Sequence, residues 1–378
     1  MSYFLAFAGF ALLIVLHEAG HFVAAKAVGM RVERFALFFP PLILKWRKKG
    51  SETEYGIGAI PLGGYVKISG MNPTEELPPG QEHRAYFRQK VWKRVVVIAA
   101  GPAVNIVLAF LILFVLFAVR PQQLVQPVVD TVQEKSPAVG VLAPGDRILS
   151  VDGRRGFEAG LTPEQGSNRV ESVRGAIGTH LCKGQKKGEK ARDGCLAAMP
   201  ARVEVLRDGK QRSIELVPRY SVRDKRPLLG VTFTTRELQA NVPEAAELSV
   251  SGMWNVTKVS VENIVKLVYD KEARDEVSGV VGGYEATRQS FEFDTVRAVT
   301  LLALISLSLA IINLFPFLPL DGGHIFWAVA EKLRGRAISF QTMEKASIVG
   351  FMLVLALFYI GLSNDISRLS SGEGFGVR

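Results

Sequence analysis

One pentapeptide near the N-terminus has the residue types and the spacing of a metal site. It reads His17-Glu18-Ala19-Gly20-His21, with two histidines four positions apart and an acid beside the first. Positions i and i+4 share one face of a helix, so both imidazoles can bind the same Zn²⁺. Glu18 lies beside them, where a carboxylate can act as a general base. We therefore take His17 and His21 as zinc ligands and Glu18 as the catalytic base.

A catalytic zinc site needs a third protein ligand, and Asp321 is the candidate. It follows an apolar run, residues 298–320, that contains no charged residue. Pro316 and Pro319 interrupt the helix there, and broken backbone at membrane depth is tolerated where it lines a buried cavity. His324 is the alternative third ligand, although a loop histidine so close to Asp321 is more typical of a neighbour.

These residues must be positioned by membrane-spanning helices. Four apolar segments are long enough to cross a bilayer, at 1–27, 95–119, 298–324 and 346–364. The pentapeptide lies inside the first, where each ionisable group costs about 2.5–3.5 kcal/mol on insertion and so indicates a function. A cleaved signal peptide is the alternative for this segment. It is disfavoured because no basic residue precedes Lys26.

The distribution of charge predicts the topology. The chain has 46 Lys and Arg against 36 Asp and Glu, a net +10 that by itself fits nucleic acid or a membrane surface. Segment 26–94 alone has 13 basic and 6 acidic residues, which places it in the cytoplasm. We expect a multi-pass protein of the inner (plasma) membrane that binds the lipid bilayer and no nucleic acid. The site then faces the cytoplasm, as does loop 325–345, whereas 120–297 and the tail 365–378 lie outside.

Segment 120–235 has the pattern of a mostly β, extracytoplasmic insert. Residues 202–206 and 213–217 alternate apolar and polar side chains around an Asp208-Gly209 turn, which predicts a hairpin. The Gly-, Lys- and Arg-rich stretch 165–193 is expected to be a loop. Cys182 and Cys195 flank part of this stretch, and they form a disulfide worth about 3 kcal/mol in an oxidising exterior or remain two free thiols.

Segment 236–297 leads back to the membrane. Between Glu244 and Leu267, apolar residues recur at helical spacing, which indicates an amphipathic helix. Such a helix lies on the membrane surface, or it packs against the insert, and the sequence fits both arrangements.

Three motifs resemble one protein family. HEAGH in the first span, GPAVN (101–105) in the second and the run from Asn313 to Leu-Asp-Gly-Gly-His324 in the third resemble the site-2 protease family of intramembrane zinc metalloproteases, and its bacterial RseP-like branch in particular. The resemblance covers nearly the whole chain. It implies four transmembrane helices with a PDZ-like insert between the second and third, zinc on His17, His21 and Asp321, and Asn313 binding the substrate backbone.

The chain departs from the family at two places. The second proline of the asparagine–proline–aspartate run commonly lies five residues after the asparagine, but here that residue is Leu318, and Pro319 follows it. The spacing from Asn313 to Asp321 is unchanged, which leaves zinc ligation intact and puts the shape of the loop in doubt. Segment 278–283 also lacks the proline expected in the corresponding family segment.

Two further segments are candidates for binding substrate. Residues 54–68 alternate apolar and small side chains, as in a strand or hairpin, and in the family this is a re-entrant, membrane-associated β element near the active site. A substrate helix must unwind before cleavage, so an exposed edge at Gly63, Gly64 and Tyr65 could accept it by strand addition. The alternative is an ordinary cytoplasmic hairpin.

The other segment, residues 136–153, resembles a PDZ signature, with Leu229 and Gly230 in its expected carboxylate-binding loop. A PDZ domain there binds the new C-terminus of a trimmed substrate or excludes intact ectodomains by size.

The fold expected is therefore a polytopic α-helical membrane protein with a β-hairpin and a PDZ-like insert. The expected function is zinc-dependent hydrolysis of a peptide bond within the transmembrane segment of a single-pass, anti-sigma-factor-like protein, after an upstream site-1 protease has trimmed it. The alternatives are an intramembrane zinc transporter, which needs a second ligand cluster, and a non-catalytic PDZ membrane adaptor, which needs neither HEAGH nor Asp321.

Overall fold

The computed structural model of the chain divides into two compact units, Met1–Leu116 with Pro243–Arg378, and Phe117–Val242. It describes residues 1–72, 75–77, 79–158, 163–185, 191–224, 226–267, 269–336 and 338–371. The insert expected from the sequence corresponds to the second unit, and the membrane part is assembled from the two ends of the chain.

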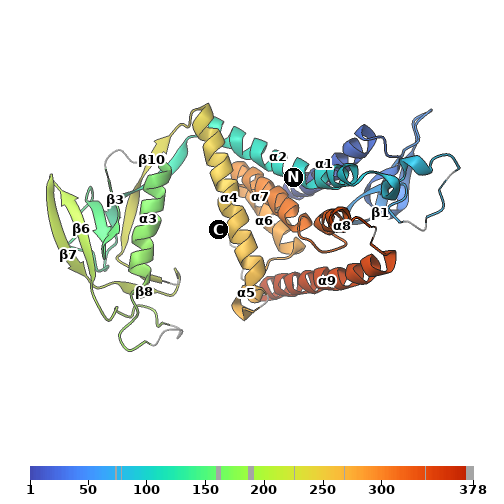
Figure 1. The fold of residues 1–378 in the computed structure, drawn as a ribbon. Helices are drawn as coiled ribbons and strands as arrows, with labels where there is room; N and C mark the ends of the chain where they lie inside the picture. The colour runs from blue at the N-terminus through green and yellow to red at the C-terminus, as the bar shows by residue number, and fades with distance from the viewer. Residues whose placement is uncertain are drawn as a thin grey trace. The chain divides into compact units, whose positions relative to one another are not determined.

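The first unit is mainly helical (Figure 1). Its helices are α1 Ser2–Ala27, α2 Val91–Val119, α4 Val242–Lys266, α5 Lys271–Glu276, α6 Val280–Phe293, α7 Thr295–Asn313, α8 Asp321–Arg334 and α9 Phe340–Ser371. Four of them, α1, α2, α7 and α9, are long and apolar enough to cross a membrane. Each of these four overlaps one of the predicted spans, and the expected helix at 244–267 is present as α4.

The third span is shorter than the sequence predicted. Helix α7 ends at Asn313, and a new helix, α8, begins at Asp321. The break follows from Pro316 and Pro319, which cannot donate the backbone hydrogen bonds of a continuous helix. Residues 325–334, expected in a loop, continue α8 instead, because Gly335 at φ 69° is the first residue that ends it.

A small β sheet covers part of α1. Strand β1 (Val32–Trp46) pairs with strand β2 (Glu54–Ile68). Each strand bends back near its middle, so that both of its halves pair with the other strand. Residues 34–37 pair with 64–67 on one side and with 54–57 on the other, and 42–46 pair with 55–58. Segment 54–68, expected to be a strand or a hairpin, is strand β2, and its two halves do not pair with each other because a segment of β1 lies between them. Residues 64–68 form one edge of the sheet.

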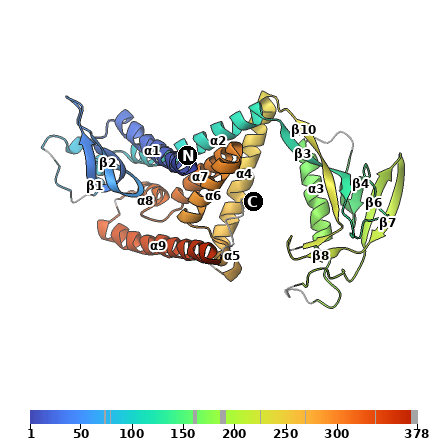
Figure 2. The ribbon, with the colours of Figure 1, turned by 180° about the vertical axis from the view of Figure 1, so that it is seen from behind.

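Helix α6 lies beside α1, α7 and α9 (Figure 2). It contacts α1 through Tyr284, whose hydroxyl donates to the carbonyl of Tyr3 at 3.0 Å. Its N-terminus is capped from α9 by the fully buried Asp365, which accepts hydrogen bonds from the N–H groups of Gly279 and Gly282 at 3.0 and 2.7 Å. This carboxylate joins the last long helix to α6.

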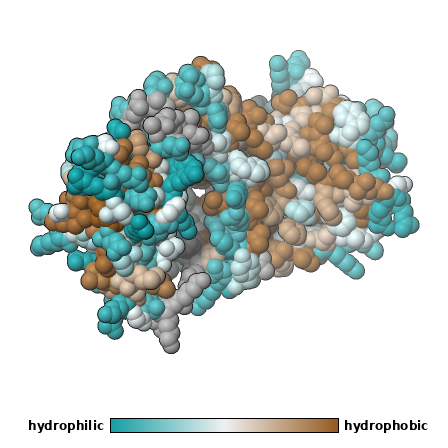
Figure 3. All heavy atoms as spheres, turned by 60° about the vertical axis from the view of Figure 1, so that its left-hand side comes forward, coloured by the Kyte–Doolittle hydropathy of each residue, from teal (hydrophilic) through white to brown (hydrophobic). Residues whose placement is uncertain are grey.

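The outer surface of the helical unit is strongly apolar (Figure 3). Large exposed side chains include Phe4, Leu12, Leu111, Val115, Phe351 and Leu353, all on candidate spans. Such an apolar surface would aggregate in water and is expected of helices that face lipid. The chain is therefore a membrane protein.

The second unit is a sheet with one packed helix. Its strands are β3 Gln122–Val132, β4 Arg147–Val151, β5 Arg154–Arg155, β6 Ala201–Arg207, β7 Lys210–Leu216, β8 Arg219–Ser221, β9 Arg226–Leu228 and β10 Val231–Leu238. The main sheet has the order β10-β3-β4-β6-β7, with β5 beside β4. The predicted hairpin is β6–β7, and its turn residues Asp208 and Gly209 have φ of 52° and 74°.

The expected loop at 165–193 is partly wrong, because residues Pro163–Gly178 form helix α3. Val173, Ala176 and Ile177 lie on one face of α3 and join the core of the unit with Ile148 and Val203. Gly, Lys and Arg dominate the composition of the stretch and conceal this short apolar face. The expected disulfide between Cys182 and Cys195 is present.

Candidate metal centre

Helix α1 brings the two histidines of the pentapeptide to one face. Both are 7% exposed, and their Nε2 atoms lie 3.3 Å apart. The separation of four residues produces this convergence on a regular helix. Each imidazole therefore points its Nε2 atom at the same buried point.

Asp321 completes a triangle of donor atoms. Its Oδ2 atom lies 3.4 Å from Nε2 of His17 and 3.3 Å from Nε2 of His21. A tetrahedral zinc site with bonds of about 2.0–2.1 Å has ligand–ligand edges of about 3.3 Å, so the three edges match it. Oδ2 is buried and has no hydrogen-bond partner. Of the described residues, this is the group of three whose ligand atoms could hold one metal ion.

Glu18 lies between this triangle and the β sheet. Gly64 of β2 packs against it so closely that a Cβ atom at position 64 would overlap Cγ of Glu18. The sheet edge formed by residues 64–68 therefore begins beside the carboxylate expected to act as the base. A Cβ atom at Gly63 would meet the ring of Phe39, and the ring of Tyr65 lies 6.4 Å from that ring, so of the three predicted edge residues Gly64 is the one in contact with Glu18.

Helix α2 supports the triangle from behind. A Cβ atom at Gly101 would overlap the imidazole of His21, and one at Gly20 would meet the carbonyl of Ala100. These two glycines let α1 and α2 approach closely. Nδ1 of His21 donates to the carbonyl of Val97 at 2.9 Å, which leaves Nε2 of the neutral ring as the metal-binding nitrogen.

An ion pair holds α8 against α2. Arg94, 9% exposed, donates to Glu331 at 2.7 Å. Gly322 and Gly323 at the start of α8 lie against the carbonyls of Leu314 and Phe317, so the turn after α7 is tightly closed. The two glycines close the first turn of α8, where Asp321 lies, and the ion pair holds the other end of the helix.

The remaining predicted residues are placed as follows. Asn313 ends α7 and is half-buried, and His324 lies one turn along α8 from Asp321, outside the three-residue group.

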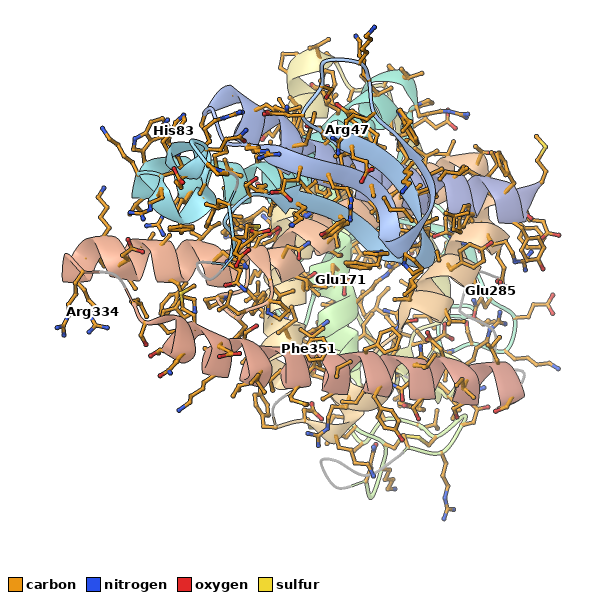
Figure 4. The ribbon with its side chains drawn as sticks, turned by 90° about the vertical axis from the view of Figure 1, so that its right-hand side faces the viewer. Arg47, His83, Glu171, Glu285, Arg334 and Phe351 are labelled. Atoms are coloured by element: carbon orange, nitrogen blue, oxygen red, sulfur yellow. A yellow bond between two sulfur atoms is a disulfide. The ribbon has the colours of Figure 1, made fainter. Side chains whose placement is uncertain are left out.

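Figure 4 shows this unit from the side of the sheet, with Arg334 at the end of α8 and Phe351 on α9. Leu229 and Gly230 belong to the second unit, where they line a cavity of about 590 Å³.

Comparison with known proteins decides the family. The model of peptidase family M50 matches residues 5–357. The chain belongs to this family, the site-2 proteases. Curated relatives of this M50 peptidase include a protein of Agrobacterium fabrum, 29% identical, with 95% of this chain and 93% of the relative covered. One of Rhizobium meliloti is 28% identical (95% and 94%), and one of Clostridium acetobutylicum is 27% identical (97% and 98%).

Each of these three relatives carries the name "putative zinc metalloprotease". The family is zinc-dependent, and this M50 peptidase is a zinc metalloprotease. The donor set of His17, His21 and Asp321 fits that metal, because two imidazole nitrogens and one carboxylate oxygen are common ligands of catalytic zinc and leave a fourth position open.

Two groups at the site of this M50 peptidase were not assigned a role from the sequence. Asn105 lies on α2 with its amide nitrogen 3.2 Å from Nδ1 of His17, and Gly101 makes room for His21. The signal was present, since a polar residue inside an apolar span is expensive and indicates a function. Only the contact with His17 shows what Asn105 does there.

Proposed function

We propose that this M50 peptidase hydrolyses a peptide bond within the transmembrane segment of a single-pass membrane protein, with His17, His21 and Asp321 as the zinc ligands and Glu18 as the base. The observation that carries the proposal is the triangle of donor atoms, with edges of 3.3, 3.3 and 3.4 Å. Its two histidines lie on α1, a helix apolar enough to cross a membrane, and Asp321 begins α8, which follows the candidate span α7.

The chain's own groups have separate parts in the mechanism. Zinc supplies Lewis-acid chemistry there, which polarises a carbonyl and lets water ionise near neutral pH. Glu18 accepts the proton of the attacking water on its carboxylate and returns it to the leaving amine. The buried surroundings of His17 and His21 exclude other water from the reaction.

The sheet edge at 64–68 supports a way to present the substrate. These residues pair with 32–37 on one side, and a cavity of about 380 Å³ lies along Tyr65–Ile68. An unwound substrate segment added to this edge would gain backbone hydrogen bonds and would reach Glu18 at Gly64. Asn313 at the end of α7 would bind the substrate backbone from α7.

The loop at Leu229 and Gly230 supports a second contact with the substrate. Gly230 has φ 79°, and neither residue's N–H donates a hydrogen bond within the described part of the chain. Two free N–H groups beside a cavity suit a carboxylate. We therefore propose that the second unit is a PDZ-like domain that binds the new C-terminus left by an upstream site-1 protease, as on an anti-sigma-factor-like protein.

The charge distribution supports the orientation. We propose that segment 26–94 and the site face the cytoplasm and that the second unit lies outside, where the Cys182–Cys195 bond is stable. A zinc transporter is less well supported, because the described residues contain no second group of metal ligands. A PDZ adaptor would not need the triangle.

The test compares Glu18→Gln with a matched control, Glu344→Gln, which lies exposed on α9. Purified protein is reconstituted with a single-span substrate, and cleavage and bound zinc are both measured. Glu18→Gln should lose about 10²- to 10⁴-fold in cleavage and keep its zinc, because only proton transfer is removed. Normal cleavage by Glu18→Gln would contradict the role of Glu18 as the base.

A further inference from the structure

Asn105 lies against the imidazole of His17 on the side away from the other two ligand atoms. It is fully buried on α2, and its amide nitrogen lies 3.2 Å from Nδ1 of His17. Nε2 of the same ring faces His21 and Asp321 at 3.3 and 3.4 Å. One side chain on α2 therefore contacts the back of a ring whose front belongs to the triangle.

The protonation of the two ring nitrogens is coupled. A neutral imidazole carries its proton on one nitrogen and a lone pair on the other. For Nε2 of His17 to bind a metal, Nδ1 must carry the proton and must donate it to an acceptor. The amide of Asn105 presents either its NH₂ group or its carbonyl oxygen to Nδ1 after a half-turn, and only the oxygen accepts. That oxygen, Oδ1, is buried and has no other partner.

The second histidine shows the same arrangement with a backbone acceptor. Nδ1 of His21 donates to the carbonyl of Val97 at 2.9 Å, eight residues before Asn105 on α2. Both rings are thus held from one helix through their Nδ1 atoms. His17 differs in that its partner is a side chain, which mutation can change without altering the backbone.

We propose that Asn105 is a positioning residue that fixes the metal-binding tautomer and the orientation of His17, with its carbonyl oxygen accepting from Nδ1. This inference rests on the proposed zinc site. It assigns a part to the first and last positions of GPAVN: Gly101 leaves space for His21, and Asn105 holds His17. Pro102, inside the same helix, has no N–H to donate.

The experiment measures zinc affinity by competition with a chelator for three purified full-length variants. Asn105→Leu keeps the branched shape of the side chain and removes the acceptor, and we expect its affinity to fall by about 10- to 100-fold. Asn105→Asp restores an acceptor and should bind zinc close to the wild-type value. Ser306→Ala is the matched control, because it removes a buried hydrogen bond to the backbone carbonyl of Asn105 at 3.0 Å and leaves His17 untouched.

The outcomes separate the possibilities. Wild-type affinity in Asn105→Leu would overturn the inference, and so would an equal loss in Asn105→Leu and Asn105→Asp, since packing alone would then explain both. If the wild type itself binds no zinc, the proposed function fails as well.

A second measurement does not depend on any variant folding. The chain has five histidines, so nitrogen NMR of ¹⁵N-histidine-labelled wild type gives few signals. With zinc added, we expect His17 to carry its proton on Nδ1. A proton on Nε2 of His17, or coordination through Nδ1, would contradict the assignment.

Discussion

Gly64 lies directly against the side chain of Glu18, and no larger residue fits between the sheet edge and the carboxylate. The two residues belong to separate elements, β2 and α1, and are 46 positions apart. The edge proposed to bind substrate and the base proposed to act on it are therefore in contact. A larger side chain at position 64 would displace the carboxylate of Glu18.

We predict that Gly64→Ala lowers cleavage and leaves bound zinc unchanged. The added methyl group would displace Glu18, and misplacing a catalytic group by about 1 Å costs on the order of 10²-fold. Cleavage of a single-span substrate and metal content test this. Gly252→Ala is the control, because its Cβ meets no atom within 4 Å. Loss of zinc in Gly64→Ala would show that the metal site, and not Glu18 alone, had moved.

Gly101→Ala, in contrast, should lower the zinc affinity as well as the cleavage rate. Its methyl group would overlap the imidazole of His21, so zinc affinity should fall by about 10-fold or more, and cleavage should fall with it. Chelator competition measures the affinity, with Gly283→Ala as a control in open space. Unchanged affinity would mean that α1 and α2 separate easily, contrary to the close packing at Gly20.

Asp365→Ala should loosen the contact between α9 and α6. It removes the acceptor of two backbone N–H groups and of the Ser278 hydroxyl, and each buried donor left unpaired costs about 1–3 kcal/mol. Thermal unfolding in detergent should show a lower midpoint than for Glu344→Ala, an exposed acid on the same helix. Equal midpoints for the two variants would rule out a stabilising cap.

The second unit should lose stability in acid through Asp146. Burial raises the pKa of this carboxyl, whereas hydrogen bonds from Arg207 at 2.6 Å and from the N–H of Ala143 lower it. The hydrogen bonds and the charge of Arg207 together outweigh burial, so the pKa lies below its ordinary value. Such a group stabilises the fold above its unfolded pKa of about 4, and the contribution disappears as pH falls through the folded pKa.

Asp146→Asn should therefore reduce stability at pH 7 by about 1.5–3 kcal/mol and weaken its dependence on acid pH. Hydrogen exchange in β6 between pH 7 and pH 3 measures both effects. Asp208→Asn is the control, since Asn also adopts the positive φ of that turn. The same acid dependence in wild type and Asp146→Asn would assign it to other carboxyls.

Removing the disulfide should destabilise its loop. Cys182 and Cys195 are 13 residues apart, and closing such a loop is worth about 3 kcal/mol. The double Cys→Ser variant should exchange the amide of Lys183, which donates to Leu196, faster than wild type does. Unchanged exchange at Lys183 in the double variant would contradict a local effect.

The sequence predicted the site better than it predicted the surrounding structure. His17, Glu18, His21 and Asp321 stand out because ionisable residues in apolar spans are costly and rare, and their clustering needed only the helical repeat and one break at Pro316 and Pro319. Four spans followed from hydropathy alone. The ligand roles themselves stay predictions until zinc is measured.

Long-range pairing is what the sequence did not reveal. Residues 34–37 lie between the two halves of β2, and nothing local in 54–68 indicates that a third segment enters its hairpin. Helix α3 was hidden by a polar composition, although Val173, Ala176 and Ile177 carry a helical repeat. The role proposed for Asn105 depends on its contact with His17, which is 88 positions away in the chain.

The division of the helical unit between the two ends of the chain also sets an order of events during synthesis. His17 and His21 emerge from the ribosome first, whereas Asp321 follows about 300 residues later, after the whole second unit. At about 5–20 residues per second, that interval is roughly 15–60 s. The three side chains cannot meet before it has passed, so a nascent chain is inactive as a protease until its inserted unit has been made.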